Sequence, residues 1–242
     1  MKGFSKRLLL GAVVASAVVP VSAQEKVEGT LSADVVSAYI WRSQHNASFS
    51  VQPSLGLSYG GLSLGAWGSF ALSPQPEFTG TQEEIDLTLG YTAGGFHVGV
   101  TDYFFFGNGN PYFSYASHST SHTFEGNVGY DFGALAVNWY TNLAGADGVN
   151  RSGKRAYSSY LQLDAPFSLA GMDWTATVGA VPFATDFYVD DRSSGFHVNQ
   201  LALRAQRELQ VGSFALPLFG QVIANPSSRE MYFVAGITLN AF

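Results

Sequence analysis

The chain has 242 residues, of which charged side chains make up 12% and aromatic side chains 14%, and its formal net charge is −6. The charged fraction is about half of the roughly 25% usual for soluble domains, and the aromatic content excludes intrinsic disorder. Without cysteine the chain cannot form a disulfide, a thiolate metal site or a lipid-modified N-terminal cysteine, and the acidic excess argues against a nucleic-acid partner.

The N-terminus has the layout of a cleaved secretory signal peptide. Three basic residues among the first seven precede an apolar run over residues 8–19, and small residues follow at 21–23. The apolar run is too short to cross a membrane as a helix. We therefore predict a signal peptide at residues 1–23 and a single domain at 24–242, within which no apolar run reaches 18 residues.

The rest of the chain alternates apolar and polar residues with a period of two. Over residues 49–59 the odd positions are Phe, Val, Pro, Leu, Leu and Tyr, whereas the even positions between them are Ser, Gln or Gly. This pattern predicts strands whose two faces meet different environments. About twelve strands are expected, the first over residues 31–42 and the last three near 196–208, 212–223 and 229–242.

Two details modify this pattern near the C-terminus. The phase of the alternation slips between Val198 and Leu201, which predicts a β-bulge. Pro217 falls inside the eleventh expected strand, where it would remove one ladder hydrogen bond.

The joints between the strands alternate in length. Those on the side of the N-terminus are short, at 60–61, 93–95, 131–134, 165–172 and 209–211. Those on the opposite side are mostly longer and richer in turn residues, at 43–48, 73–82, 107–121, 144–156, 182–195 and 225–228. An antiparallel meander with short turns at one end and long loops at the other is typical of outer-membrane barrels.

The distribution of charge indicates which face points outward. The polar face consists mostly of Ser, Gly, Thr, Asn and Gln, whereas the surface of a soluble β-protein is rich in Lys and Glu. We therefore predict an all-β fold, a closed antiparallel up-and-down transmembrane β-barrel whose apolar face meets membrane lipid. Aromatic residues near the strand ends are expected to form girdles at the membrane interfaces. They are Tyr39, Trp41, Tyr59, Phe70, Tyr91, Phe104, Tyr130, Trp139 and Trp174.

The C-terminal residue, Phe242, is the type of residue that barrel-assembly machinery uses as a signal, although it is out of phase with the apolar face of its strand. Together with the signal peptide it predicts export to the outer membrane of a Gram-negative bacterium. The expected partners are membrane lipid, that assembly machinery and a small hydrophilic solute.

Several segments resemble a known bacterial family. Residues 37–42 read SAYIWR, residues 52–55 read QPSL, residues 61–69 read GLSLGAWGS, and residues 84–87 read EIDL ahead of Gly-Tyr at 90–91. These segments resemble the conserved-hypothetical family Gcw_chp, with Ser43 standing where that family usually has Gly. The resemblance implies an outer-membrane-type barrel and supplies no activity.

The strand parity also identifies residues that should face the lumen. Inward charges could line a pore and favour cations, or they could form salt bridges across the barrel. Inward aromatic rings could stack on sugars, or they could fill the interior. The pore-lining candidates are Asp34, Arg42, Trp67, Glu84, Asp86, Tyr103, Glu125, Tyr140, Tyr160, Asp164 and Arg204.

A barrel with a small polar lumen favours a porin-like channel for passive passage of small hydrophilic solutes rather than an enzyme. One alternative is an outer-membrane hydrolase with a rim site near His118 and His122, which lie in a serine-rich segment. Another is a non-conducting barrel with a structural or adhesive role. No order or spacing of residues is diagnostic of catalysis, so no catalytic residue, cofactor or metal is predicted.

Overall fold

The computed structural model describes residues 26–72, 83–106, 109–116, 119–188, 195–212 and 214–240. The expected signal peptide, His118 and Phe242 lie outside these ranges. Among the described residues, no helix is long and apolar enough to cross a membrane.

The described chain is an all-β protein with fourteen strands. They are β1 (Glu28–Val36), β2 (Tyr39–Trp41), β3 (Gln44–Ala47), β4 (Ser50–Tyr59), β5 (Leu62–Ala71), β6 (Glu83–Ala93), β7 (Phe96–Phe105), β8 (His122–Asp131), β9 (Ala136–Gly145), β10 (Ser159–Leu169), β11 (Met172–Val181), β12 (His197–Val211), β13 (Phe214–Asn225) and β14 (Glu230–Asn240).

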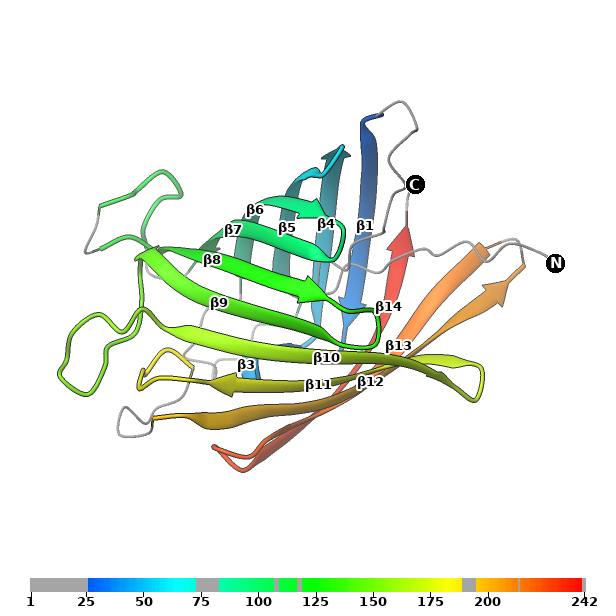
Figure 1. The fold of residues 1–242 in the computed structure, drawn as a ribbon. Helices are drawn as coiled ribbons and strands as arrows, with labels where there is room; N and C mark the ends of the chain where they lie inside the picture. Colours follow the sequence, from blue (N-terminus) through cyan, green and yellow to red (C-terminus); the bar gives the residue numbers. More distant parts are fainter. Residues whose placement is uncertain are drawn as a thin grey trace.

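Twelve of these strands form a closed antiparallel barrel, as the alternation predicts. The order around the barrel follows the chain, and β1 closes the ring by pairing with both β4 and β14. Figure 1 shows the long loops of β7–β12 extending to one end and the short hairpin turns of β8–β11 at the other. Pro217 lies within β13, where it is paired with Glu208.

The exterior and interior of the barrel are inverted relative to a soluble protein. One row of paired outward residues, Leu57, Leu64, Leu89 and Val100, crosses four neighbouring strands, and each side chain is 37–54% exposed. The side chains that are buried, in contrast, are largely polar. They include Ser50, Ser54, Ser69, Glu84, Asp86, Glu125, Asn138, Asp164, Thr177 and Thr238. This distribution confirms that the apolar face is the outer one.

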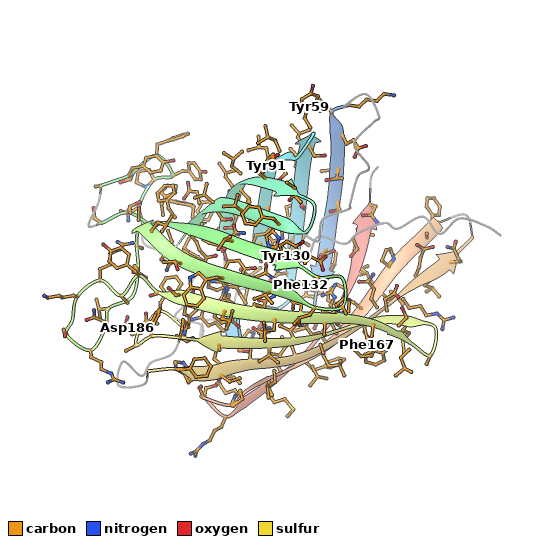
Figure 2. The ribbon with its side chains drawn as sticks, viewed as in Figure 1. Tyr59, Tyr91, Tyr130, Phe132, Phe167 and Asp186 are labelled. Carbon is orange, nitrogen blue, oxygen red and sulfur yellow. The ribbon has the colours of Figure 1, made fainter. Side chains whose placement is uncertain are left out.

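The short-turn end carries exposed aromatic rings on the outer wall. Figure 2 shows Tyr59, Tyr91, Tyr130, Phe132 and Phe167 near the short turns, whereas Asp186 lies among the long loops at the opposite end. The five rings are 42–67% exposed. Tyr59, Tyr91 and Tyr130 are among the predicted girdle residues, and their positions match an aromatic girdle at one interface. The prediction is wrong for Phe104, which is fully buried.

The predicted first strand, residues 31–42, is correct only as far as Val36. The barrel strand β1 ends at Val36, and residues 39–47 form a separate hairpin of β2 and β3. Tyr39 and Trp41 therefore do not belong to an outer girdle, because they lie in this hairpin. The expected joint at 43–48 is likewise mostly strand β3.

Two β-bulges in the barrel strands alter the side-chain direction near the long-loop end. Gly179 is paired with Gln200 and Ala180 with Val198, so Asn199 is the extra residue on β12. This confirms the slip of phase in the sequence. A second bulge, which the sequence did not reveal, makes Leu143 the extra residue opposite Phe124 and Glu125. Both bulges lie beside the residues that hold the β2–β3 hairpin.

Candidate functional site: a hairpin inside the barrel

The β2–β3 hairpin turns through two residues with left-handed backbone conformations. Trp41 is paired with Gln44, and the two residues between them, Arg42 and Ser43, have φ angles of 47° and 63°. A two-residue turn of this kind is normally occupied by Asn-Gly or Gly-Gly, because a side chain at positive φ costs about 1–2 kcal/mol. Contacts made by the turn must offset this strain, and Arg42 makes them.

Arg42 is buried and forms a bidentate ion pair with Glu125 on β8. Nη1 donates to Oε2 at 2.5 Å and Nη2 donates to Oε1 at 2.9 Å, while the two side chains are 6% and 2% exposed. Nη1 also donates to the hydroxyl of Tyr188, in the loop between β11 and β12, at 2.7 Å. The hydroxyl of Tyr103 on β7 donates to the other carboxylate oxygen, Oε1, at 2.9 Å.

Aromatic rings enclose the same guanidinium. Its Cζ lies 4.5 Å from the ring centroid of Trp41, 4.3 Å from that of Tyr140, 4.7 Å from that of Tyr160 and 5.5 Å from that of Tyr188. These distances are within the range of cation–π attraction. We call Tyr103, Glu125, Tyr140, Tyr160 and Tyr188 the arginine cage.

A glycine makes room for one wall of the cage. The hydroxyl of Tyr160 lies against Gly179 on β11 and donates to Gln200 at 2.9 Å. A Cβ at position 179 would collide with that hydroxyl. Gly179 therefore leaves the space that the Tyr160 hydroxyl occupies while its ring lies beside Arg42.

The Arg42 guanidinium and the Tyr188 hydroxyl keep their ordinary protonation states. Burial is the largest single influence on Arg42 and opposes its charge, but Glu125, Tyr188 and Tyr103 together outweigh it, so that the pKa of the guanidinium is raised well above its ordinary value. Burial likewise raises the pKa of Tyr188, whose hydroxyl therefore remains protonated at neutral pH. Arg42 is thus a charged guanidinium beside the neutral hydroxyl of Tyr188.

Further hydrogen bonds attach the hairpin to the wall on several sides. The Tyr39 hydroxyl donates to Glu84 Oε2 on β6 at 2.9 Å. Gln44 Nε2 donates to the carbonyl of Phe187 at 2.6 Å. The side chain of the bulge residue Asn199 donates to the carbonyl of Arg42 at 3.1 Å. The β12 bulge therefore directs its side chain to the tip of the hairpin.

The base of the hairpin packs on an apolar part of the inner wall. Val36, Ala202, Phe219, Ile223 and Val234 form a buried cluster over β1 and β12–β14. Ala38 and Ile40 of the hairpin segment, together with Tyr232, pack against it. We call this cluster the apolar wall.

The hairpin therefore crosses the lumen from one side to the other. It is connected to β1 and β4, which are neighbours, while Arg42 reaches Tyr140 on β9 and Tyr160 on β10. Four strands separate β4 from β9, and four separate β1 from β10, so the guanidinium reaches the opposite wall. Towards the short-turn end the lumen is lined by small or polar residues, including Gly56, Ser63, Gly65, Thr88, Gly90, Gly99 and Asn127.

The structure places the sequence candidates in two separate groups. Arg42, Tyr103, Glu125, Tyr140 and Tyr160 come together in and around the arginine cage. Arg42 is the exception to the parity argument, because it reaches the interior from the hairpin turn and not from a barrel strand.

The remaining candidates lie at inward positions around the cage. Glu84 accepts from Tyr39, and the rings of Tyr39 and Trp67 are 5.4 Å apart in an edge-on contact. Asp86 is paired with Trp67 on one side and with Tyr103 on the other. Asp164 accepts from Thr177 at 2.7 Å.

Asp34 and Arg204 lie on the other wall. Asp34 accepts from Thr238 at 2.6 Å, and the guanidinium of Arg204 stacks on Phe219 at 3.5 Å. The second inward arginine therefore lacks the bidentate carboxylate that holds Arg42.

Sequence reasoning missed Tyr188 and Asn199 as partners of Arg42. Tyr188 lies in a loop, where no periodicity indicates direction. Asn199 was visible only as the slip of phase, which predicts a bulge without saying what its side chain contacts.

His122, the candidate hydrolase residue at the rim, is enclosed by other side chains. Nδ1 of His122 lies 2.8 Å from Asp102 Oδ1, and Nε2 lies 2.5 Å from the carbonyl oxygen of Tyr112. The ring is fully buried and stacks on Tyr115 at 4.3 Å. With one nitrogen on a carboxylate and the other on a carbonyl, neither is free to take a proton from a nucleophile. Among the described residues no group of three or more His, Asp or Glu side chains could hold a metal ion.

Comparisons with known proteins identify a family and give no activity. Residues 22–193 match the family described as "Bacterial protein of unknown function (Gcw_chp)". No curated protein matches the chain. Among solved structures the chain is similar to OmpF of Salmonella typhi in complex with daunomycin, with 9% identity and a TM-score of 0.35, covering 89% of this chain and 97% of that chain. That likeness is too distant to bear on function.

Proposed function

The chain belongs to the Gcw_chp family of bacterial proteins of unknown function, and we propose that it is an outer-membrane β-barrel with a porin-like role in the passage of small hydrophilic solutes. The observation that carries the proposal is the inversion of polarity. Exposed leucines, valines and aromatic rings cover the outer wall, while carboxylates, amides and hydroxyls are buried inside. A closed barrel satisfies every ladder hydrogen bond without water, and it is therefore suited to lipid.

The location rests on the same physics. A signal peptide would carry the chain through the inner membrane, and strand β14, which closes the barrel against β1, would be the element read by barrel-assembly machinery. Insertion in the outer membrane of a Gram-negative bacterium would place the apolar outer wall in contact with lipid. The long-loop end, opposite the N-terminus of β1, would face the outside of the cell.

The lumen supports passage of small polar or cationic solutes, under the control of the hairpin. Small residues line the part of the lumen near the short turns, and the carboxylates Glu84, Asp86, Glu125 and Asp164 outnumber the arginines on the wall that the hairpin tip reaches. Acidic linings favour cations. The hairpin fills the lumen at the level of the arginine cage, so the resting conductance should be low.

A second candidate is a non-conducting barrel with a structural role. The bridging hairpin favours it, because a bidentate ion pair across the lumen would brace two opposite walls. Removal of this brace distinguishes the two candidates, because it should open a channel in the first and only weaken the barrel in the second.

Planar-bilayer recordings of the purified mature protein test the proposal. We expect rare, small steps from the wild type and frequent ohmic steps, selective for potassium over chloride, from Arg42→Ala. If Arg42→Ala runs as a heat-modifiable, folded barrel on gels and its bilayers remain silent, the passage role is wrong and the structural barrel is favoured. A protein that is monomeric in buffer without detergent would defeat the membrane barrel itself.

A further inference from the structure

The arginine cage is built by the barrel and not by the hairpin. Tyr103, Glu125, Tyr140 and Tyr160 lie on four consecutive strands, β7 to β10, and Tyr188 lies in the loop after β11. Trp41 is the one ring near the guanidinium that comes from the hairpin. The hairpin therefore supplies the cation, and the barrel supplies nearly everything that recognises it.

The geometry of the cage matches a planar guanidinium. The Glu125 carboxylate takes two parallel N–H donors, at 2.5 and 2.9 Å, while Tyr103 and Tyr188 donate to the same carboxylate and hold its orientation. The rings of Tyr140 and Tyr160 lie 4.3 and 4.7 Å from Cζ. A fork of donors on a carboxylate, with aromatic faces beside it, suits guanidinium better than a compact ammonium.

We propose that the arginine cage is a binding site for solutes that carry a guanidinium group, which Arg42 occupies as an internal competitor. A solute entering from the lumen competes with Arg42 for Glu125, and its binding releases the hairpin tip. Access through the lumen rests on the proposed function, but recognition by the cage does not. Binding in detergent and conductance in a bilayer therefore test the two separately.

The first experiment measures binding of methylguanidinium to folded protein in detergent micelles by ligand-observed NMR. Arg42→Ala empties the cage without changing any residue that forms it. We expect methylguanidinium to bind Arg42→Ala about tenfold or more tightly than the wild type, because an attached competitor acts at millimolar or higher effective concentration. The double variant Arg42→Ala/Glu125→Gln should lose this gain.

Matched controls separate recognition from a general effect of removing an arginine. Arg204→Ala also removes an inward, ring-stacked arginine, and it should gain no affinity for methylguanidinium. Urea has the planar shape without the charge and should not bind Arg42→Ala. Equal binding of urea, an equal gain in Arg204→Ala, or full binding by the double variant would overturn the proposal.

A second measurement does not depend on the folding of Arg42→Ala. The chain has no cysteine, and Ser43, beside Arg42, is 2% exposed. Ser43→Cys therefore provides a single buried thiol whose reaction with a charged, water-soluble thiol reagent reports departure of the hairpin tip. Millimolar methylguanidinium should accelerate this reaction at least about threefold and urea should not. Unchanged rates at saturating methylguanidinium would refute displacement.

The outcomes also distinguish the two proposals from each other. Binding to the cage together with silent bilayers would uphold the guanidinium site and reject passage. Ohmic steps from Arg42→Ala without methylguanidinium binding would uphold passage and reject the site.

Discussion

The two walls that hold the hairpin use different physics. On β7–β10, one charged group sits among phenols and a carboxylate, where attraction depends on distance and can be replaced by water or another cation. On β1 and β12–β14, Ala38 and Ile40 pack on five buried apolar side chains that have no alternative partner. This difference indicates a hairpin that is anchored at its base and releasable at its tip.

Two measurements separate the contributions of the two walls. Opening of the tip is reported by the reaction rate of Ser43→Cys, and the stability of the barrel by its free energy of unfolding in denaturant. Changes in the arginine cage should alter the thiol reaction rate more than the unfolding free energy, and changes in the apolar wall should do the reverse.

The largest effect is expected from Glu125→Ala in the Ser43→Cys background. It leaves the Arg42 guanidinium buried without its carboxylate, which costs about 3–5 kcal/mol. The protein can escape this cost by moving Arg42 into water, so thiol reaction should accelerate about a hundredfold while the free energy of unfolding falls less. Adding Arg42→Ala should restore most of the unfolding free energy that Glu125→Ala loses. A rate within about threefold of the parent would contradict a releasable tip.

Ile223→Ala should give the next largest effect, and this effect should appear in the free energy of unfolding. Ile223 is 2% exposed in the apolar wall, and truncation of a buried isoleucine costs about 2–4 kcal/mol. The cavity remains whether or not the hairpin moves, so the free energy of unfolding should fall by about that amount. Thiol reaction should change less than in Glu125→Ala.

Val222→Ala is its matched control, because the neighbouring residue faces outward and is 45% exposed. We expect a clearly smaller loss of unfolding free energy there. Equal losses at the two positions would contradict packing of the hairpin base on Ile223.

The barrel itself could be predicted from the sequence because its cause is local. Alternation with a period of two assigns each side chain to a face, and the scarcity of charge on the polar face assigns that face to the interior. The inward positions of Glu84, Asp86 and Glu125 could be predicted from this alternation. These inferences need no knowledge of which strand lies opposite which.

The hairpin could not be predicted in this way because its causes are long-range. Residues 38–41 are apolar and strand-forming in the same way as Val35 and Val36, and Arg42-Ser43 contains neither Gly nor Asn, so nothing local marks the end of β1 or the turn. The turn exists because Arg42 finds Glu125, 83 positions further along the chain. Strain at positive φ is compensated by a partner that the local sequence does not contain.

The smallest expected effect tests the link between the β12 bulge and the hairpin tip. Asn199→Ala removes one hydrogen bond, 3.1 Å long, from the side chain to the Arg42 carbonyl, with a net cost of about 0.5–1.5 kcal/mol. Because the strained turn lies at that carbonyl, the loss should appear mainly as tip opening, with thiol reaction about three- to tenfold faster.

Asn225→Ala is the control for that prediction, since its side chain accepts two backbone hydrogen bonds, from Ser227 and Ser228, within the β13–β14 turn. It removes more hydrogen bonds than Asn199→Ala but none from the hairpin. If the bulge exists to hold the tip, Asn199→Ala must raise the thiol rate more than Asn225→Ala does. The opposite order would mean that the bulge serves the curvature of β12 alone, and that Glu125 and the cage tyrosines hold the tip without it.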